Sequence, residues 1–409
     1  MRNLIYWGAA LIALAIMPWL VPASWVVVLS KMLIAALFAL AFNLLSGQAG
    51  MLSFGHAAYF ATGTFATLHL MQAAEAGFGV PTPLLPIAGM IAGLICGLVC
   101  GIFATMRSGV YFSMITLAIA ELFYNLAPNM HELFGGEGGI SSFRLPWAGI
   151  TFGTDMEVYY LVAGWTALAA ALLYFYTTTP FGRLTLALRE NEQRVRFLGF
   201  NAYHSRIIVF SVSAMFSGLA GGLLAVTNES ANYVLFEIGS SAAVVLHTFI
   251  GGSGVFLGPA LGAILLTGFS YTVSDATSLV LLYEGVIFIL VMIYAPQGVG
   301  GALLALRGPI LSGRWPRLVA PFAVVLTAAA GATAAFVFTV ELLNRFFSTE
   351  HFGHMQGQQM LLPVEFASHQ WHVLSPTTWG IPLVLAIASA SLFRIGIRRS
   401  KLVWSEVTR

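Results

Sequence analysis

Residues 25–45 read WVVVLSKMLIAALFALAFNLL and contain one charged residue, Lys31. A helix that crosses the hydrocarbon core of a bilayer needs about 20 mostly apolar residues, because each residue adds only about 1.5 Å of length. This stretch meets the requirement by itself, and similar stretches follow it along most of the chain. The sequence therefore predicts an all-α protein that crosses a membrane many times.

The composition of the whole chain supports the same conclusion. Of its 409 residues, 58% are hydrophobic and 8% are charged, and the mean hydropathy is +0.87. A typical soluble domain has about 25% charged residues, which keep its surface hydrated. The net charge of +2 is modest and does not indicate a protein that binds nucleic acid.

The apolar stretches also predict how the chain is organised. A core, residues 1–305, contains stretches at 4–20, 25–45, 57–71, 84–106, 110–127, 158–176, 207–226, 241–271 and 278–295. A C-terminal extension, residues 306–409, adds stretches at 318–340 and 379–393 and ends in a basic tail. Because 241–271 is broken, it forms either a re-entrant pair or two crossings, and we expect about 10 to 12 spans.

The distribution of basic residues predicts the orientation in the membrane. If the N-terminus is cytoplasmic, all of the 18 Lys and Arg residues except Lys31, Arg144 and Arg345 fall on the cytoplasmic side. Basic residues are enriched in cytoplasmic loops. We therefore expect both termini, and the long basic loop 179–206, to lie in the cytoplasm.

Two glycine-rich segments interrupt the apolar pattern. Residues 43–64 read NLLSGQAGMLSFGHAAYFATGT, and residues 248–262 read TFIGGSGVFLGPALG. Transporters bind substrate at such discontinuous helices, but small residues also serve close helix packing, and the sequence leaves both interpretations open. As lining of a substrate path it offers Asn43, Gln48, Ser53, His56, Gly251 and Gly254.

Ionisable residues inside the predicted spans are further candidates, because a charge within a membrane is costly. They are Glu121, Glu284, His56 and His247. Glu121 lies one helical turn before Asn125 and is equally compatible with a substrate contact and with a structural carboxylate. We include it in the candidate path.

The loop 179–206 reads TPFGRLTLALRENEQRVRFLGFNAYHSR. Apolar residues recur at helical spacing and charged residues fill much of the rest, which predicts an amphipathic helix. Gly182 marks its beginning, and Gly199 with Asn201 marks its end. Spacing alone allows a helix on the anionic leaflet or one that docks on a partner protein.

Several strings in this chain resemble one family of transporters. G-R-x-x-x-A-L-R-E-N-E at residues 182–192, with F-L-G-F-N at 197–201, is similar to the coupling-helix region of permeases in the branched-chain amino acid and urea group of bacterial ABC importers. N-L-L-x-G-x-x-G-x-x-S-F-G-H-A-A-Y-F at 43–60 resembles another signature of that family. Further similar elements lie at 109–118, 251–262 and 295–301, so the resemblance covers about residues 1–305 in the expected order.

The resemblance implies a machine with several subunits. This chain would pair with a second permease, a copy of itself or a shorter relative, and two cytoplasmic ATPase subunits would bind its coupling loop. An external solute-binding protein would deliver substrate, and the assembly would lie in the bacterial inner membrane. The residues carried over to ATPase coupling are Gly182, Arg183, Arg189, Glu190, Asn191, Glu192 and Gly199.

The sequence lacks the G-x-x-x-x-G-K-[ST] loop that cradles nucleotide phosphates, so ATP and Mg²⁺ belong to the partner subunits and we expect no cofactor in this chain. The extension beyond residue 305 departs from the family pattern, because the family usually ends soon after the element at 295–301. The family transports several substrates, among them amino acids, urea, amides and aromatic acids, so the resemblance does not specify the substrate.

Two other classes of membrane protein are alternatives. A secondary transporter driven by protons or sodium would use Glu121 or Glu284 as its titrating carboxylate. An intramembrane enzyme would need a nucleophile with a base or a metal cluster, and no H-E-x-x-H or G-x-S-x-G pattern is present. The polar loop 344–378 contains His351, His354, His369 and His372, but no spacing matches a metal-ligand pattern.

Overall fold

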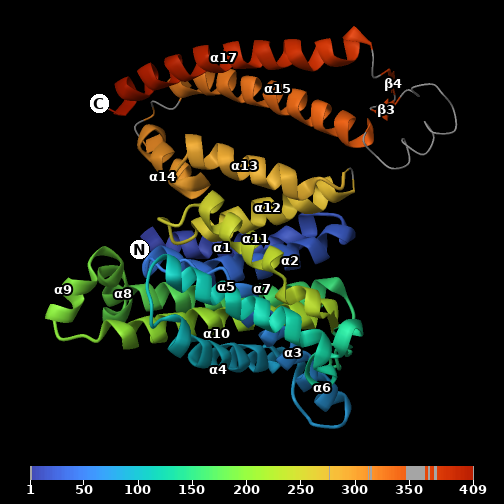
Figure 1. Ribbon diagram of the computed structural model, residues 1–409, viewed down its shortest axis with the longest axis vertical. Coiled ribbons are helices and arrows are strands. Elements are labelled where there is room, and N and C mark those ends of the chain that lie inside the picture. Colours follow the sequence, from blue (N-terminus) through green and yellow to red (C-terminus); the bar gives the residue numbers. More distant parts are fainter. Residues whose placement is uncertain are drawn as a thin grey trace. The chain divides into compact units, whose positions relative to one another are not determined.

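The computed structural model describes residues 2–275, 277–311, 313, 316–346, 364–366, 369–372 and 375–408. The chain divides into two compact units, Met1–Ala302 and Leu303–Arg409. Each unit consists almost entirely of helices (Figure 1). The all-α prediction is confirmed for the described residues.

The first unit contains thirteen numbered α-helices and two short strands among the described residues. Their bounds are α1 (Arg2–Leu20), α2 (Ala23–Asn43), α3 (His56–Glu75), α4 (Pro86–Ala104), α5 (Val110–Leu126), α6 (His131–Phe134), β1 (Ile140–Ser141), α7 (Asp155–Thr178), α8 (Pro180–Glu190), α9 (Glu192–Phe197), α10 (Ala202–Asn228), β2 (Ser230–Ala231), α11 (Ile238–Gly251), α12 (Gly258–Ser274) and α13 (Val280–Tyr294). A π-helical turn, η1 (Leu44–Gln48), continues α2, and α14 (Gly298–Leu311) leads into the second unit.

Seven described helices are long and apolar enough to cross a membrane, or eight if the bent pair α13 and α14 forms one span. This confirms a polytopic membrane fold. It also gives fewer spans by length and composition than the 10 to 12 expected. The helix α11 is not counted because it has only 14 residues. The helix α3 is not counted because its threonines and histidines lower its hydropathy, although most of its residues are buried.

The core of the first unit forms where α10 crosses α3 and α4 at glycines. A Cβ atom at Gly218 of α10 would lie 2.2 Å from the carbonyl oxygen of Gly89, and one at Gly63 would lie 2.2 Å from the carbonyl oxygen of Gly218. Small residues let helix backbones approach closely in a membrane, where dispersion replaces the hydrophobic effect as the main attraction. The outer face of α4, in contrast, exposes Ile91, Ile95, Leu98 and Ile102, as suits contact with lipid.

The second unit is a pair of long helices with a small strand pair. The helices α15 (Pro316–Phe346) and α17 (Pro376–Thr408) contain the two stretches predicted to cross the membrane, and β3 (Val364–Phe366) pairs antiparallel with β4 (His369–Trp371). A Cβ atom at Gly331 would lie 2.5 Å from Oγ of Ser389, so these helices also touch at a glycine. His351 and His354 of the predicted polar loop lie outside the described residues.

The glycine crossing predicts a large effect from one methyl group. Gly218→Ala places a Cβ against the backbone of α4, so we expect the unfolding free energy in detergent to fall by about 1–3 kcal/mol. Gly164→Ala on α7 is the matched control, because a Cβ there meets no atom within 4 Å. Thermal unfolding followed by size-exclusion chromatography measures both. Equal melting temperatures for the two variants would contradict the packing role of Gly218.

Candidate functional site

The basic loop forms two helices rather than the single predicted one. Thr179 begins α8 because its Oγ accepts the N–H of Gly182 at 3.1 Å, and Pro180 takes the first helical position. At Asn191 the backbone is extended, and the Asn191 side chain accepts the N–H of Arg194 at 3.1 Å. Asn191 therefore ends α8 and begins α9, because a capping side chain satisfies a backbone donor that the new helix leaves free.

Apolar side chains hold α8 and α9 against α10. Leu188, Val195 and Ala202 are buried together, and Leu184 and Ala187 pack against them. A Cβ at Gly182 would lie 2.1 Å from the carbonyl oxygen of Tyr176, so Gly182 permits the tight turn from α7 into α8. Gly199 follows α9 with φ of +87°, a conformation that favours glycine. We call residues 180–200 the coupling segment.

Glu192 fastens the coupling segment to α10. Its carboxylate pairs with Arg196 at 2.6 Å on α9 and with the buried Arg206 of α10. A buried guanidinium needs such a partner, because a charge is costly away from water unless it is paired. Glu192 and Asn191, both predicted to face an ATPase, thus bond within the chain itself.

Arg189 turns toward the first glycine-rich break. Its Nη1 donates to the carbonyl oxygen of Gly47 at 2.5 Å. Its aliphatic stem crosses Gly50, where a Cβ atom would lie 2.8 Å from Cγ of Arg189. The structure therefore brings together two motifs that lie 142 residues apart in the sequence.

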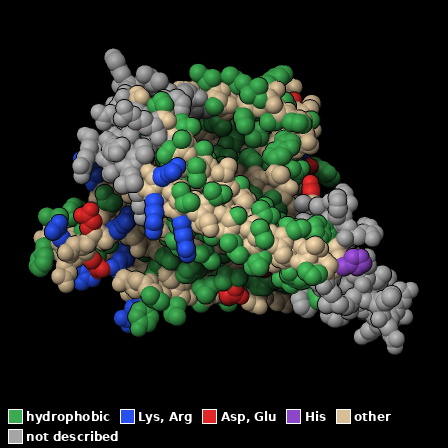
Figure 2. Space-filling view, turned by 90° about the horizontal axis from the view of Figure 1, so that it is seen from above, with side chains coloured by type: hydrophobic (Ala, Val, Ile, Leu, Met, Phe, Trp, Pro, Cys, Tyr) green, Lys and Arg blue, Asp and Glu red, His purple; other side chains and the backbone are tan. Residues whose placement is uncertain are grey.

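The solvent-exposed surface of the coupling segment is partly charged and partly apolar. Arg183, Glu190 and Arg194 are exposed. Phe197 is 89% exposed and Leu198 is 66% exposed, next to the exposed Phe200. Figure 2 shows acidic, basic and hydrophobic side chains together on the protrusion at its left, the α8–α9 end of the first unit in Figure 1. Helical spacing predicted Leu198 on the apolar face with Leu188 and Val195, and that was wrong, because Leu198 follows the end of α9 and is exposed.

The two glycine-rich breaks meet each other. The first is the π-helical turn η1, which is followed by Gly50 with φ of +69°. The second lies between α11 and α12, where Gly252 has φ of +100°. A Cβ at Gly47 would lie 2.9 Å from the carbonyl oxygen of Ser253, so the turns are in direct contact. The prediction of broken segments is confirmed.

Of the residues predicted to line a substrate path, two border a small hollow and two are buried in the core. Asn43 and Gln48 border a small hollow together with Leu40, Leu44, Leu173, Thr177 and Phe256. Ser53 and His56 are fully buried instead. Nε2 of His56 lies 2.8 Å from Oγ of Ser213, and the rings of Phe42, Tyr59 and Phe210 surround the imidazole.

The glycines of the second break have different surroundings. Gly251 packs against α12, since a Cβ there would lie 2.0 Å from the carbonyl oxygen of Gly258. Gly254 has no atom within 4 Å of its would-be Cβ and is exposed. Gly251 therefore serves helix packing, and Gly254 borders open space.

The two predicted carboxylates also differ. Glu284 of α13 is 5% exposed and accepts a hydrogen bond from the Ser270 hydroxyl of α12. Glu121 is half-buried on α5, where the Asn125 side chain donates to the Glu121 carbonyl at 2.7 Å. The structure therefore places Glu284 between two helices.

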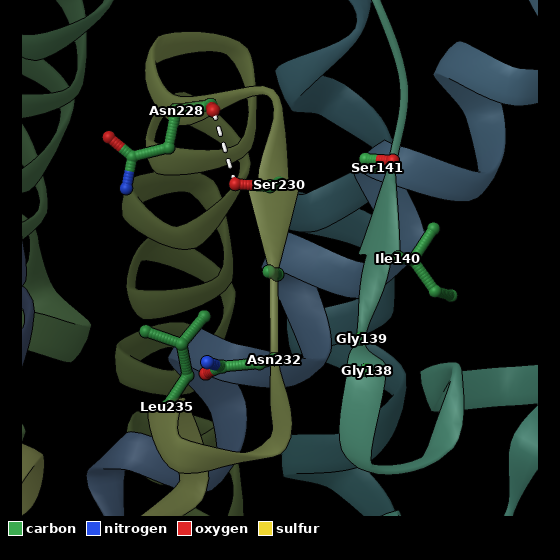
Figure 3. A pocket seen from close by; sticks show the side chains of 9 residues that line it. Gly138, Gly139, Ile140, Ser141, Asn228, Ser230, Asn232 and Leu235 are labelled. Atoms are coloured by element: carbon green, nitrogen blue, oxygen red, sulfur yellow. Dashed lines mark hydrogen bonds between the residues drawn. The ribbon is translucent and has the colours of Figure 1, made fainter.

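A second hollow, of about 300 Å³, lies at the opposite end of α10 from the coupling segment. The antiparallel strands β1 and β2 form part of its wall, and Asn228, Ser230, Asn232 and Leu235 border it (Figure 3). Beside the strands, Arg144 pairs with Glu229 at 2.9 Å. The Ser142 hydroxyl and the Phe143 N–H hold the pKa of the Glu75 carboxyl below its usual value by hydrogen bonding to it.

Residues 24–296 match the family model described as the branched-chain amino acid transport system permease component. The chain belongs to this family. It is therefore a permease subunit of the ABC transporter class and a multi-pass membrane protein. The match spans the helices of the first unit that carry the coupling segment and both breaks.

The names of individual relatives specify different transported substrates. The high-affinity branched-chain amino acid transport system permease protein LivM of Escherichia coli is 28% identical over 71% of this chain and 73% of its own length. The guanosine ABC transporter permease protein NupQ of Bacillus subtilis is 30% identical over 44% of this chain and 57% of its own length. The autoinducer 2 import system permease protein LsrC of Yersinia pseudotuberculosis is 35% identical over 25% and 32%. No solved structure matches the chain significantly.

The charge pairs of Glu192 make a prediction about local stability. Glu192→Gln removes the negative partner of Arg196 and Arg206, and a partly exposed pair contributes about 1 kcal/mol. We expect trypsin to cleave after Arg194 and Arg196 about fivefold faster, because cleavage follows the population of the open segment. Glu190→Gln, an exposed neighbour, is the control and leaves the rate unchanged. Equal rates for both variants would show that Glu192 does not hold the segment.

Proposed function

We propose that this permease works in an importer that brings a branched-chain amino acid, or a related small polar solute such as urea, an amide or an aromatic acid, into the cytoplasm. The similarity to LivM over 71% of the chain supports this cargo class. The other relatives, named for guanosine and autoinducer 2, show that the shared family sequence does not specify one cargo. The substrate is best tested by calorimetry of the companion solute-binding protein with leucine, urea and an aromatic acid.

The proposal includes four partners and a membrane. They are a second permease subunit, two cytoplasmic ATPase subunits that bind ATP and Mg²⁺, and an external solute-binding protein, and the assembly would lie in the bacterial inner membrane with both termini of this chain inside. Closure of the ATPase pair on ATP would move the coupling segment and shift the permease between inward-open and outward-open states. Nucleotide can drive such a shift only through its differential affinity for the two states.

The observation that carries the docking proposal is the surface of the coupling segment. Glu192 is already paired within the chain and Asn191 caps α9, yet Phe197, Leu198 and Phe200 are exposed in the same segment as the exposed Glu190 and Arg194. Exposed apolar clusters rimmed by charge are typical of protein interfaces, and aromatic residues dominate interface energetics. An ATPase groove that receives this surface would bury the aromatics and pair the charges.

Gradient-driven transport is the alternative that Glu121 and Glu284 suggested. Membership in the ABC permease family argues against it. The hydrogen bond from Ser270 also gives Glu284 a structural role between α12 and α13. The proposed importer requires neither carboxylate to titrate.

Docking predicts that Glu190→Lys and Phe197→Ser each weaken co-purification of the ATPase in detergent. Loss of an interface anchor costs about 2 kcal/mol or more, which corresponds to about 30-fold weaker binding. Glu237→Lys is the matched control, because Glu237 is also exposed but follows β2 in the chain, at the opposite end of α10. Membrane insertion of all three variants should equal that of the parent chain.

Unchanged ATPase binding by both Glu190→Lys and Phe197→Ser would exclude this surface as the docking site. Weaker binding by Glu237→Lys to the same degree would indicate a non-specific effect of the added lysine instead.

A further inference from the structure

We infer that Arg189 is a positioning residue that joins the coupling segment to the broken end of α2, and that it is not a contact for the ATPase. The inference rests on the proposed ATP-driven function. It adds the contacts through which a movement of α8 would reach the two glycine-rich breaks. Arg189 would therefore bond within this chain, whereas Glu190 and Arg194 would contact the ATPase.

The end of α2 needs a donor from elsewhere in the protein. A helix leaves its last carbonyl groups without intrahelical partners, and the turn η1 ends α2 in this way. The N–H of Met51 satisfies the carbonyl of Leu45 at 3.0 Å. The guanidinium of Arg189 satisfies that of Gly47 at 2.5 Å, and a cation is favoured at the negative end of a helix.

The stem of Arg189 adds a steric contact to the hydrogen bond. Gly50, with φ of +69°, lies under the stem so closely that a Cβ would come within 2.8 Å of Cγ and 3.3 Å of Cβ of Arg189. Because the head of Arg189 bonds Gly47 in η1 and its stem touches Gly50 just after η1, α8 cannot shift without moving this segment or breaking both contacts.

The turn passes the displacement on to the second break and to the small hollow. The would-be Cβ of Gly47 lies 2.9 Å from the carbonyl oxygen of Ser253 and 2.2 Å from Oδ1 of Asn43. Asn43 and Gln48, on either side of Gly47, border the hollow. Arg189 thus bonds a glycine that touches the second break and the Asn43 side chain and that precedes Gln48 in the chain.

The other arginines of the segment have different partners or surroundings. Arg196 and Arg206 bond Glu192, and Arg183 and Arg194 are exposed, as Arg189 is. Within residues 180–206, it is Arg189 whose side chain bonds the backbone of α2 and its turn. Removal of the Arg189 side chain should therefore lower transport without lowering ATPase binding, which removal of Arg194 should not do.

The test compares Arg189→Met with Arg194→Met in the assembled transporter. Methionine keeps an aliphatic stem over Gly50 and removes the donors. We expect Arg189→Met to co-purify ATPase within about twofold of the parent chain but to lose about tenfold in ATP-driven uptake into vesicles, because a charge-assisted hydrogen bond is lost. Arg194→Met, on the docking surface, should lower co-purification and uptake together. Arg189→Lys, which keeps a cation, should restore part of the uptake.

Three results would overturn the inference. One is loss of ATPase co-purification by Arg189→Met to the level of Arg194→Met, which would make Arg189 an ATPase contact. Another is uptake by Arg189→Met equal to that of the parent. A parent chain that retains no ATPase would overturn the proposed function together with the inference.

If Arg189→Met does not reach the membrane, Gly50→Ala replaces it. The added methyl group would lie against the aliphatic stem of Arg189 and displace it, while the exposed docking residues stay unchanged. The same separation of retained ATPase binding and lost uptake is expected, and proportional loss of both would overturn the inference.

Discussion

Backbone groups at a helix break inside a membrane must be satisfied by the protein, because lipid offers no hydrogen bonds. In this permease a similar need arises at the end of α2, in the last residues of the candidate span Ala23–Gln48, where Arg189 bonds the carbonyl of Gly47 in the π-helical turn η1. The donor comes from α8, outside the predicted spans. A backbone group at the end of a candidate span is thereby bonded by the element proposed to bind the ATPase.

Glycine makes this arrangement possible by removing side chains where backbones meet. Gly47 admits Ser253 and Gly50 admits the Arg189 stem, while Gly251 and Gly258 bring α11 and α12 together. At the centre of the unit, Gly63, Gly89 and Gly218 do the same for α3, α4 and α10. Glycine therefore acts both in packing, as one interpretation of the sequence held, and in placing the two breaks against each other.

Much of the fold could be predicted from local pattern, and much of the site could not. Apolar length located helices such as α2 and α10, and glycine runs located the breaks, because both signals lie within a few residues. The partners of Arg189, Glu192 and His56 were not readable. Arg189 bonds a residue 142 positions away and His56 bonds one 157 positions away, and helical periodicity carries no information on such pairs. It likewise placed Asn191 inside one helix, where the structure has a cap.

The central claim is that α8 and the end of α2 move as one body. The most direct measurement is the structure of the assembled transporter, determined with and without bound ATP. The account predicts that the guanidinium of Arg189 remains hydrogen-bonded to the carbonyl oxygen of Gly47 in both states while the ATPase subunits rearrange. An Arg189 side chain that leaves Gly47 and bonds an ATPase residue in either state would contradict it.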